Sequence, residues 1–338
     1  METNTTPHND NNLMHSYSSI IETTNNNIPP KTLFDYLSFF TKKTDTNMSS
    51  YIYLDSCNYY DKLIRNSKDY YLCNDHIELI KNSKDSFTKH LNDITDIIEI
   101  GPGSDYVIRN KTMVILDYAR NAKNYLAIDN CKQYLDETCD FLKTNTSNIN
   151  ISSLEADLMQ EDKLQVPLAE NSKKCLLFLG GTLANFHKEQ QNHCLKQIYN
   201  MLNPGDLFII TADTNQNEES LIRAYHNQDA QNLFMGVVNY FATINDSFRE
   251  CASALKIECK WNKLEQYVDI FFVAQEKFSF KFSNNKDIII EKAQELRGIR
   301  AYKQTQQENI SILNKNGFKV IDILNNSNKT KEFICRRV

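Results

Sequence analysis

The stretch IIEIGPGSDYV, residues 97–107, decides the fold. An apolar run ends at Glu99 and Ile100, and Gly101 and Gly103 follow at once, two of only 8 glycines in 338 residues. Glycine adopts left-handed backbone conformations at little steric cost, so it is the usual residue where a chain must turn sharply. The stretch therefore predicts a buried strand that ends in a tight turn, with backbone coming close to a ligand.

Strands and helices are expected to alternate on both sides of this turn. Apolar runs predict strands, and amphipathic stretches such as 132–143 and 189–201 predict the helices between them; the strands are expected near 95–100, 123–128, 150–155, 174–180 and 206–212. Such alternation is typical of a parallel sheet covered by helices on both faces. A mixed α+β domain without this order is the alternative that the sequence leaves open.

The alternation stops after residue 213. A helical stretch is expected over 216–252 and antiparallel strands within 265–282, followed by a helix at 305–316 and two strands at 317–324 and 331–337. An insertion thus interrupts an α/β core, which then finishes with two strands. Before the core, residues 1–30 are polar and Asn/Thr-rich, and they predict a flexible tail.

The glycine turn fits some ligands better than others. Parallel α/β sheets bind ligands at the carboxyl ends of their strands. A dinucleotide turn, G-x-G-x-x-G, would need a third glycine where Tyr106 stands, and no phosphate-binding G-x-x-x-x-G-K-[ST] motif occurs. Asp129 ends the second expected strand and Asp157 follows the third, so each could accept hydrogen bonds from a nucleoside. Taken singly, each Asp is equally well explained as a turn residue or a helix cap.

Composition limits the partners. The net charge of -5 argues against an extended nucleic-acid surface, and no apolar run approaches the ~20 residues that cross a bilayer. Nine cysteines with no C-x-x-C pair are typical of reduced thiols in a cytoplasmic protein. His187 and His193 lack partners at metal-ligand spacing, so no metal is expected. We expect a cytoplasmic monomer that acts on a small molecule without nucleic acid or membrane.

The turn Glu99-Ile-Gly-Pro-Gly resembles the acidic-x-Gly-x-Gly turn of class I S-adenosylmethionine-dependent methyltransferases. FLGGTLANF, residues 178–186, is similar to the F-L-G-S-T-x-x-N-x motif of the histidine-specific methyltransferase family, whose best-known member is the ergothioneine-pathway histidine Nα-methyltransferase. The segments at 58–80 and 217–227 are similar to two further segments of that family. The resemblance extends over about 45–338.

The resemblance implies a class I fold, mostly parallel with an antiparallel last strand, and S-adenosyl-L-methionine as cofactor. It implies that Asn185 and Tyr70 orient the substrate amine. The implied cofactor contacts are Glu99, Gly101, Gly103, Asp129, Asp157, Leu158 and Gly180.

The implied domain organisation has four parts. Residues 1–45 form the tail and a lead-in helix, and 46–93 form the N-terminal part of an accessory lobe. Residues 94–213 and 305–338 form the cofactor-binding core, and 214–304 complete the accessory lobe.

The chain departs from the family in one functional segment. The family's E-I-S-x-K-Y segment supplies a glutamate and a serine to the histidine ring, and these positions fall on Ile299 and Ala301. Of the family's F-N-x-N pocket segment only Asn239 remains. The sequence therefore predicts an N-methyltransferase of histidine or a related amine. A protein substrate, and a binding or regulatory protein with a repurposed acceptor pocket, stay open as alternatives.

Overall fold

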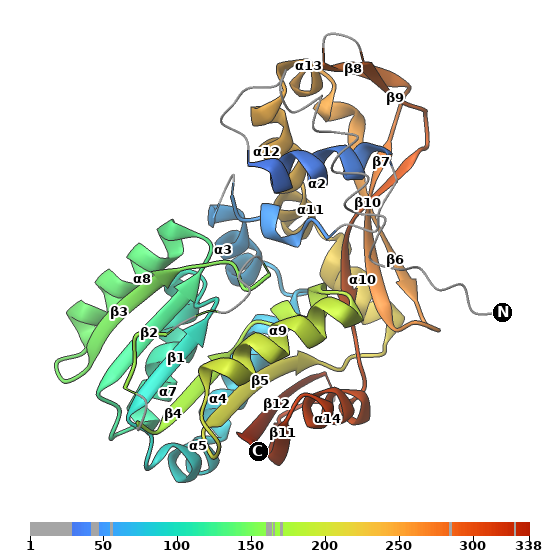
Figure 1. The fold of residues 1–338 in the computed structure, drawn as a ribbon. Coiled ribbons are helices and arrows are strands. Elements are labelled where there is room, and N and C mark those ends of the chain that lie inside the picture. The colour runs from blue at the N-terminus through green and yellow to red at the C-terminus, as the bar shows by residue number, and fades with distance from the viewer. Residues whose placement is uncertain are drawn as a thin grey trace. The chain divides into compact units, whose positions relative to one another are not determined.

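The computed structural model describes residues 29–41, 47–54, 57–159, 164, 166–169, 172–283, 286–327 and 329–338. The chain divides into two compact units, which Figure 1 shows in one ribbon. The smaller unit comprises the described residues before 56 with Phe234–Glu258 and Ile270–Ile299. The larger unit comprises Ser56–Leu233, Cys259–Asp269 and Arg300–Val338. The tail expected at 1–30 lies almost entirely outside the described residues.

A seven-stranded sheet in the order β11-β12-β5-β4-β1-β2-β3 forms the centre of the larger unit (Figure 1). Its strands are β1 Asp96–Ile100, β2 Asn124–Asp129, β3 Asn150–Glu155, β4 Lys174–Phe178, β5 Leu207–Asp213, β11 Phe318–Asn325 and β12 Thr330–Arg337. The first five pair in parallel, whereas β12 runs antiparallel to both β5 and β11. The predicted class I sheet with an antiparallel last strand is confirmed.

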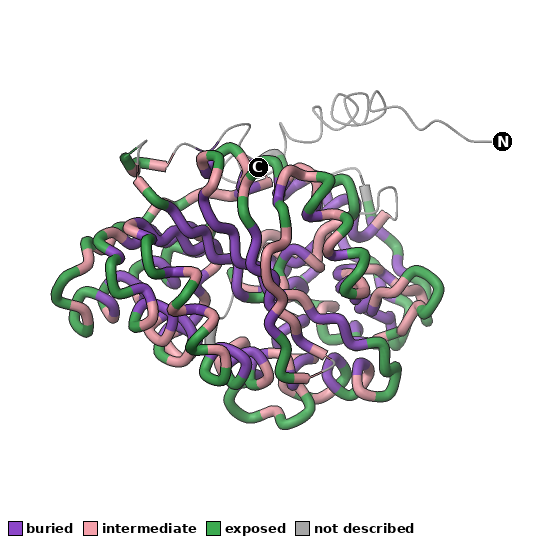
Figure 2. Tube along the Cα trace, turned by 90° about the horizontal axis from the view of Figure 1, so that it is seen from below, coloured by how far each residue is buried: buried purple, intermediate pink, exposed green. Residues whose placement is uncertain are grey.

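Helices cover both faces of this sheet because its central strands carry apolar side chains on both sides. Ile97 and Ile98 are consecutive residues of β1 that belong to two different buried clusters. The first cluster includes residues of α4 Tyr71–Asn82, α5 Lys84–Leu91, α7 Met113–Tyr118 and α8 Lys132–Asn145. The second includes residues of α9 Lys188–Met201 and α14 Gln306–Lys315. Figure 2 shows the central strands buried along their length.

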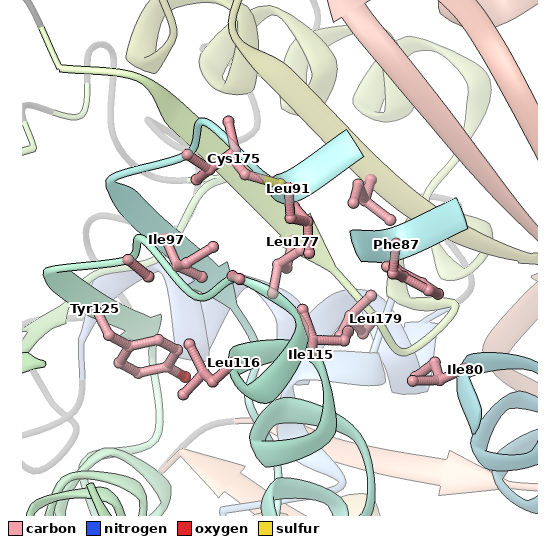
Figure 3. Packing of buried hydrophobic residues seen from close by; sticks show 14 of the residues in the cluster. Ile80, Phe87, Leu91, Ile97, Ile115, Leu116, Tyr125, Cys175, Leu177 and Leu179 are labelled. Atoms are coloured by element: carbon pink, nitrogen blue, oxygen red, sulfur yellow. The ribbon is translucent and has the colours of Figure 1, made fainter. Parts of the chain in front are cut away.

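Figure 3 shows the first cluster from close by. Ile97 and Leu177 come from neighbouring strands, and Ile115 of α7 and Phe87 of α5 pack over the same face. Each of these four side chains has 0% of its surface exposed. This packing holds the helices that precede and follow β1 in fixed places beside the glycine turn.

The rest of the larger unit is mainly helical. It contains α3 Cys57–Asn66, α6 Asp105–Val107, the π-helix η2 Ile108–Thr112, the 3-10 helix η3 Thr182–Asn185, α10 Glu218–His226 and most of α11 Gln228–Phe234. The helices expected within 51–82 and over 216–252 are thus confirmed in outline.

The smaller unit has an aromatic core. The Tyr36 ring lies 5.0 Å from that of Phe40 and 5.1 Å from that of Phe241, so segments far apart in sequence share this core. The elements of this unit are α2 Pro30–Thr41, η1 Ser49–Tyr51, α12 Gly236–Ile244, α13 Asp246–Arg249, η4 Ala252–Ala254, β8 Phe278–Ser283 and β9 Lys286–Ile290. A three-stranded sheet, β10-β7-β6, has residues in both units; its strands are β6 Leu255–Asn262, β7 Tyr267–Ala274 and β10 Glu295–Tyr302.

The predicted cofactor-binding core and accessory lobe stay a prediction. In the division into compact units, residues 57–93, which the prediction places in the accessory lobe, group with the sheet. The reason is that Leu79, Ile80, Phe87 and Leu91 belong to the cluster beneath β1. Residues 214–233, 259–269 and 300–304 also group with the sheet, so the smaller unit takes only part of the predicted insertion.

Candidate functional site

The glycine turn after β1 has the geometry that its sequence predicts. Gly101 and Gly103 have φ angles of 66° and 76°, in the left-handed region that favours glycine. The Gly101 amide donates a hydrogen bond to the Ile128 carbonyl at 2.8 Å, which ties the turn to β2. A Cβ at Gly101 would meet no atom within 4 Å, so the turn has open space beside its backbone.

Glu99 supports this turn from beneath. The Thr112 hydroxyl donates to both carboxylate oxygens, at 3.1 and 2.9 Å, and the Tyr125 hydroxyl donates to Oε2 at 2.6 Å. The side chain is fully buried, and burial raises the pKa of Glu99 although these hydrogen bonds oppose the increase. Both carboxylate oxygens of Glu99 thus accept hydrogen bonds from protein groups, and its predicted contact with the cofactor stays a prediction.

Asp129 and Asp157 lie at the ends of β2 and β3, as predicted. Asp129 Oδ1 accepts a hydrogen bond from the Cys131 amide, and Asp157 Oδ1 accepts one from the Met159 amide, each at 2.8 Å. Burial raises the pKa of Asp129 to about 6, against hydrogen bonds from the local backbone. Neither Asp caps a long helix: the cap of α8 is Cys131. Leu158 is buried in the second cluster.

The β4 turn brings Asn185 to the same edge of the sheet. Gly180 follows the buried end of β4, and Gly181 has a φ of 73° at the start of η3. Asn185 is the last residue of η3, and His187 takes the cap position of α9. A Cβ at Gly181 would lie 3.5 Å from Leu72, so the start of α4 reaches this turn.

Tyr70 precedes α4 and connects the glycine turn to α10. Its partly buried ring packs in a small cluster with Val107 and Tyr106, which follow the glycine turn. The same ring lies edge-on to that of Tyr225 in α10, with centroids 6.4 Å apart. The next residue, Tyr71, is buried.

A buried ion pair closes the carboxyl end of β5. Lys303 Nζ lies 2.8 Å from Asp213 Oδ2, and both side chains are only 2% exposed. Lys303 also donates to the Tyr225 hydroxyl at 2.7 Å, and Tyr71 donates to Asp213 at 2.8 Å. Burial is the largest single effect and lowers the pKa of Lys303, but the charge attraction and hydrogen bonds of Asp213 and Tyr225 together outweigh it, so the pKa of the ammonium group is raised.

A small pocket lies beside this end of β5, on the side of η3 and α14. It is lined by Leu183, Ala184, Ile210, Thr211, Ala212, Asp213, Tyr302, Gln304 and Asn309. We refer to it as the β5 pocket. Asn185 directly follows two of its residues in the chain.

The residues at this edge fit a nucleoside cofactor with a charged amino-acid end. Ser104, which follows the glycine turn, is 3% exposed, and its Oγ makes no hydrogen bond within the described chain. The open side of Gly101 and this unpaired hydroxyl leave room and a polar partner for a ligand, beside the carboxylates of Asp129 and Asp157. No group of three or more His, Cys, Asp or Glu in the described ranges is arranged to hold a metal ion.

A profile of the histidine-specific, S-adenosylmethionine-dependent methyltransferases matches residues 23–337. The chain belongs to this family. The chain is therefore an S-adenosylmethionine-dependent methyltransferase by family, and the resemblance of its motifs is confirmed. None of the described helices is long and apolar enough to span a membrane.

Two curated relatives resemble this chain at low sequence identity. Ergothioneine biosynthesis protein 1 of Neurospora crassa is 26% identical over 189 residues, which are 54% of this chain and 21% of that protein. The chain thus spans about a fifth of the length of this relative. The N-methyltransferase imqF of Aspergillus flavus is 22% identical over 269 residues, 76% of this chain and 72% of the relative.

Solved structures resemble the chain weakly. The PH0226 protein of Pyrococcus horikoshii has 14% identity and a TM-score of 0.45, with 85% of this chain and 98% of that chain covered. The CcbJ methyltransferase of Streptomyces caelestis has 12% identity and the same TM-score of 0.45, with 78% and 95% covered.

Sequence reasoning missed the ion pair and the β5 pocket. Lys303 and Asp213 are far apart in sequence, and no spacing rule joins them. The one available signal was Asp213 at the end of a strand, the same kind of signal that marked Asp129. At the positions where the family has its ring-binding glutamate and serine, Ile299 and Ala301 are 3% and 1% exposed, so both are buried apolar residues of β10.

Proposed function

We propose that this methyltransferase transfers a methyl group to the amine of an amino acid or a closely related small molecule. One observation carries the proposal: the carboxyl ends of four adjacent parallel strands hold the glycine turn, two aspartates and Asn185 at one edge of the sheet. Open α/β sheets bind their ligands at this edge. Membership of the family supports the chemistry.

The cofactor contacts are proposed from the ends of β1, β2 and β3. The Gly101 and Gly103 backbone allows the amino-acid end of the cofactor to approach, and the unpaired Ser104 hydroxyl offers it a hydrogen bond. Asp129 accepts from the ribose hydroxyls and Asp157 from the adenine amino group. Leu158 packs on the adenine ring, and Gly180 lies by the amino-acid end.

Glu99 has a different part in this proposal. Because its carboxylate is held by Thr112 and Tyr125, it fixes the first residue of the turn relative to β2 and η2. A turn that is held in place before binding loses less conformational entropy when the cofactor binds. Glu99 is therefore proposed to affect the cofactor through the shape of the turn.

The reaction needs alignment more than acid or base strength. When bound, S-adenosylmethionine supplies a methyl group already activated on a sulfonium. The protein must then hold a neutral amine in line with that methyl, and such alignment can be worth about 7–11 kcal/mol. We propose that Asn185 and Tyr70 orient the amine. A site that excludes water also lowers the pKa of the amine, because burial disfavours its charged form.

The proposal also covers the oligomeric state of the protein and its compartment. In the described chain only Leu54, Leu264, Ile289 and Val338 are large hydrophobic residues with exposed side chains, which supports a monomer. The eight cysteines whose side chains are described are free thiols, which supports a reducing compartment such as the cytoplasm. Gel filtration coupled to light scattering measures the oligomeric state.

The test begins with calorimetry. S-adenosylhomocysteine is titrated into the wild type, into Asp129→Ala, and into Asp136→Ala as a control on the exposed face of α8. We expect micromolar binding that only Asp129→Ala abolishes. Methyl transfer to the common amino acids is then followed by mass spectrometry. Failure of the wild type to bind refutes the cofactor site, whereas binding without transfer to any amino acid refutes the acceptor and favours a regulatory protein or a protein substrate.

A further inference from the structure

A buried polar cluster joins α4 to two strands of the sheet. Its members are His76 of α4, Thr211 of β5 and Glu332 of β12, which are 1%, 2% and 0% exposed. Glu332 Oε2 accepts a hydrogen bond from the Thr211 hydroxyl at 3.1 Å and lies 2.5 Å from His76 Nε2. His76 Nε2 also lies 3.1 Å from the Thr211 oxygen. Because the one hydroxyl hydrogen of Thr211 goes to Glu332, that oxygen can only accept from His76, so Nε2 carries a hydrogen.

Stability alone does not account for this cluster. His76 Nδ1 and Glu332 Oε1 are buried without a hydrogen-bond partner in the part of the chain that the structure describes. Both atoms have lost their hydrogen bonds to water, which opposes folding. Burial also lowers the pKa of His76, against the attraction of Glu332. Apolar side chains of similar volume often stabilise a core as well as buried charged groups do, or better. Directional bonds add something that apolar contacts lack, namely one fixed alignment of the helix on the strand.

A second polar contact joins the same helix to the same strand. The Tyr71 hydroxyl donates to Asp213 Oδ2 at 2.8 Å. From Tyr71 to His76 the helix rises about 7.5 Å, at about 1.5 Å per residue. From Asp213 back to Thr211, β5 extends about 6.6 Å. The two contacts are therefore in step, with α4 antiparallel to β5, and a shift of the helix along the strand breaks both (Figure 1).

The alignment of α4 decides where Tyr70 lies. Tyr70 is the cap residue at the start of α4, and its ring packs with Tyr106 and Val107 after the glycine turn. The start of the same helix reaches the β4 turn, which leads into Asn185. A displacement of about 1 Å at a reacting centre can lower a rate about a hundredfold. A contact that holds α4 in register with β5 therefore bears on the orientation of an acceptor beside Tyr70.

We propose that His76 and Glu332 are positioning residues for methyl transfer. With Thr211 they fix where α4 lies along β5, and through α4 they place Tyr70 beside the acceptor. This inference rests on the proposed function, in which Tyr70 orients the amine. It assigns no contact with substrate or cofactor to either residue.

The first test replaces the whole cluster by apolar side chains, in the triple variant His76→Leu, Thr211→Val and Glu332→Met. All three polar partners are removed together, so the midpoint of urea denaturation should be no lower than that of the wild type. We expect kcat/KM for the amino acid that the wild type methylates best to fall at least about tenfold, with affinity for S-adenosylhomocysteine unchanged. A folded triple variant with wild-type kcat/KM overturns the inference and leaves the proposed function in place.

The matched control removes a second contact between a histidine and a carboxylate. His90 Nε2 of α5 lies 3.1 Å from Asp322 Oδ2 of β11, so it also joins a helix to this sheet, but α5 does not carry Tyr70. The double variant His90→Leu with Asp322→Leu should keep the wild-type kcat/KM. A loss as large as that of the triple variant overturns the inference, because any weakened contact between a helix and the sheet would then have the same effect.

The second test changes only the reach of one side chain. His76→Gln carries an amide nitrogen as many bonds from the backbone as Nε2, so it can still donate to Glu332, whereas the amide of His76→Asn is one bond shorter. We expect kcat/KM near the wild-type value for the glutamine variant and at least about tenfold lower for the asparagine variant. Equal values for the two variants overturn the inference, whatever the stability of the triple variant. Absence of transfer to every amino acid by the wild type refutes the proposed function, and the inference with it.

Discussion

Replacing Lys303 by methionine removes one partner of a buried ion pair. The ammonium lies 2.8 Å from Asp213 Oδ2, and the side chains of both residues are 2% exposed. At this separation two unit charges attract by roughly 6 kcal/mol with an effective dielectric constant of about 20. Removing both charges from water costs several kcal/mol per ion, so the net contribution of the pair is far smaller than the attraction.

The loss of a single partner is nevertheless expensive. Lys303→Met leaves Asp213 buried without its counterion, and it removes the donor to the Tyr225 hydroxyl. We expect the free energy of unfolding to fall by about 3–5 kcal/mol, the usual cost of breaking a buried pair. Asp213→Asn is expected to cost a similar amount. The double variant carries no uncompensated charge, so it should cost less than the sum of the two by about 1–3 kcal/mol.

Urea denaturation followed by tryptophan fluorescence measures these costs. The single tryptophan, Trp261, belongs to the same compact unit as Lys303 and Asp213, so its signal reports on the relevant part of the chain. Lys132→Met is the matched control, because Lys132 pairs with Asp136 on the surface and should contribute little. Additive costs of the two single variants, or a loss below about 1 kcal/mol for Lys303→Met, would refute the reasoning.

Three further outcomes are expected. S-adenosylhomocysteine affinity should fall as pH decreases through about 6, the raised pKa of Asp129, because the protonated carboxyl accepts hydroxyl hydrogens poorly. The affinity should change by no more than about tenfold per pH unit. Calorimetry between pH 5 and pH 8 measures this dependence, and an affinity that stays constant over that range contradicts the prediction. Tyr125→Phe should lower the free energy of unfolding by about 1–3 kcal/mol and weaken cofactor affinity, because Glu99 loses a buried hydrogen-bond donor. An unchanged free energy of unfolding, measured by urea denaturation, contradicts this. Gly298→Ala should destabilise the smaller unit, because the new Cβ would lie 2.2 Å from the Phe272 ring; an unchanged thermal midpoint contradicts that clash.

The residues proposed to contact the cofactor could be selected from the sequence because their signals are local. Gly101 follows an apolar run, Asp129 ends one, and Asp157 lies two residues after β3; a parallel sheet brings such strand ends to one edge. The predicted positions of the strands agree with the structure to within one or two residues, because buried parallel strands appear as continuous apolar runs. The hydrogen bonds of Glu99 to Thr112 and Tyr125 could not be predicted, since a motif does not say which face of a strand its acid occupies.

The contacts around the buried ion pair could not be predicted in this way. Asp213, Tyr225 and Lys303 come from three segments that are far apart in sequence, and their contacts depend on how the insertion returns to the sheet. The same holds for Gln191 and Gln304, whose bond fixes an amide orientation that sequence cannot show. The division of the chain into units was also out of reach, because it depends on which core each helix joins.

The departure from the family motif and the β5 pocket are related through strand periodicity. Successive side chains of a strand point to opposite faces, so positions 299, 301 and 303 share one face of β10 and its continuation. Lys303 on that face bonds to Asp213 and Tyr225, and Ile299 and Ala301 beside it are buried apolar residues. Tyr302 and Gln304, on the alternate positions, line the β5 pocket. The side chains of this segment that line the β5 pocket are therefore at even positions, whereas the positions that match the family's ring-binding residues are odd.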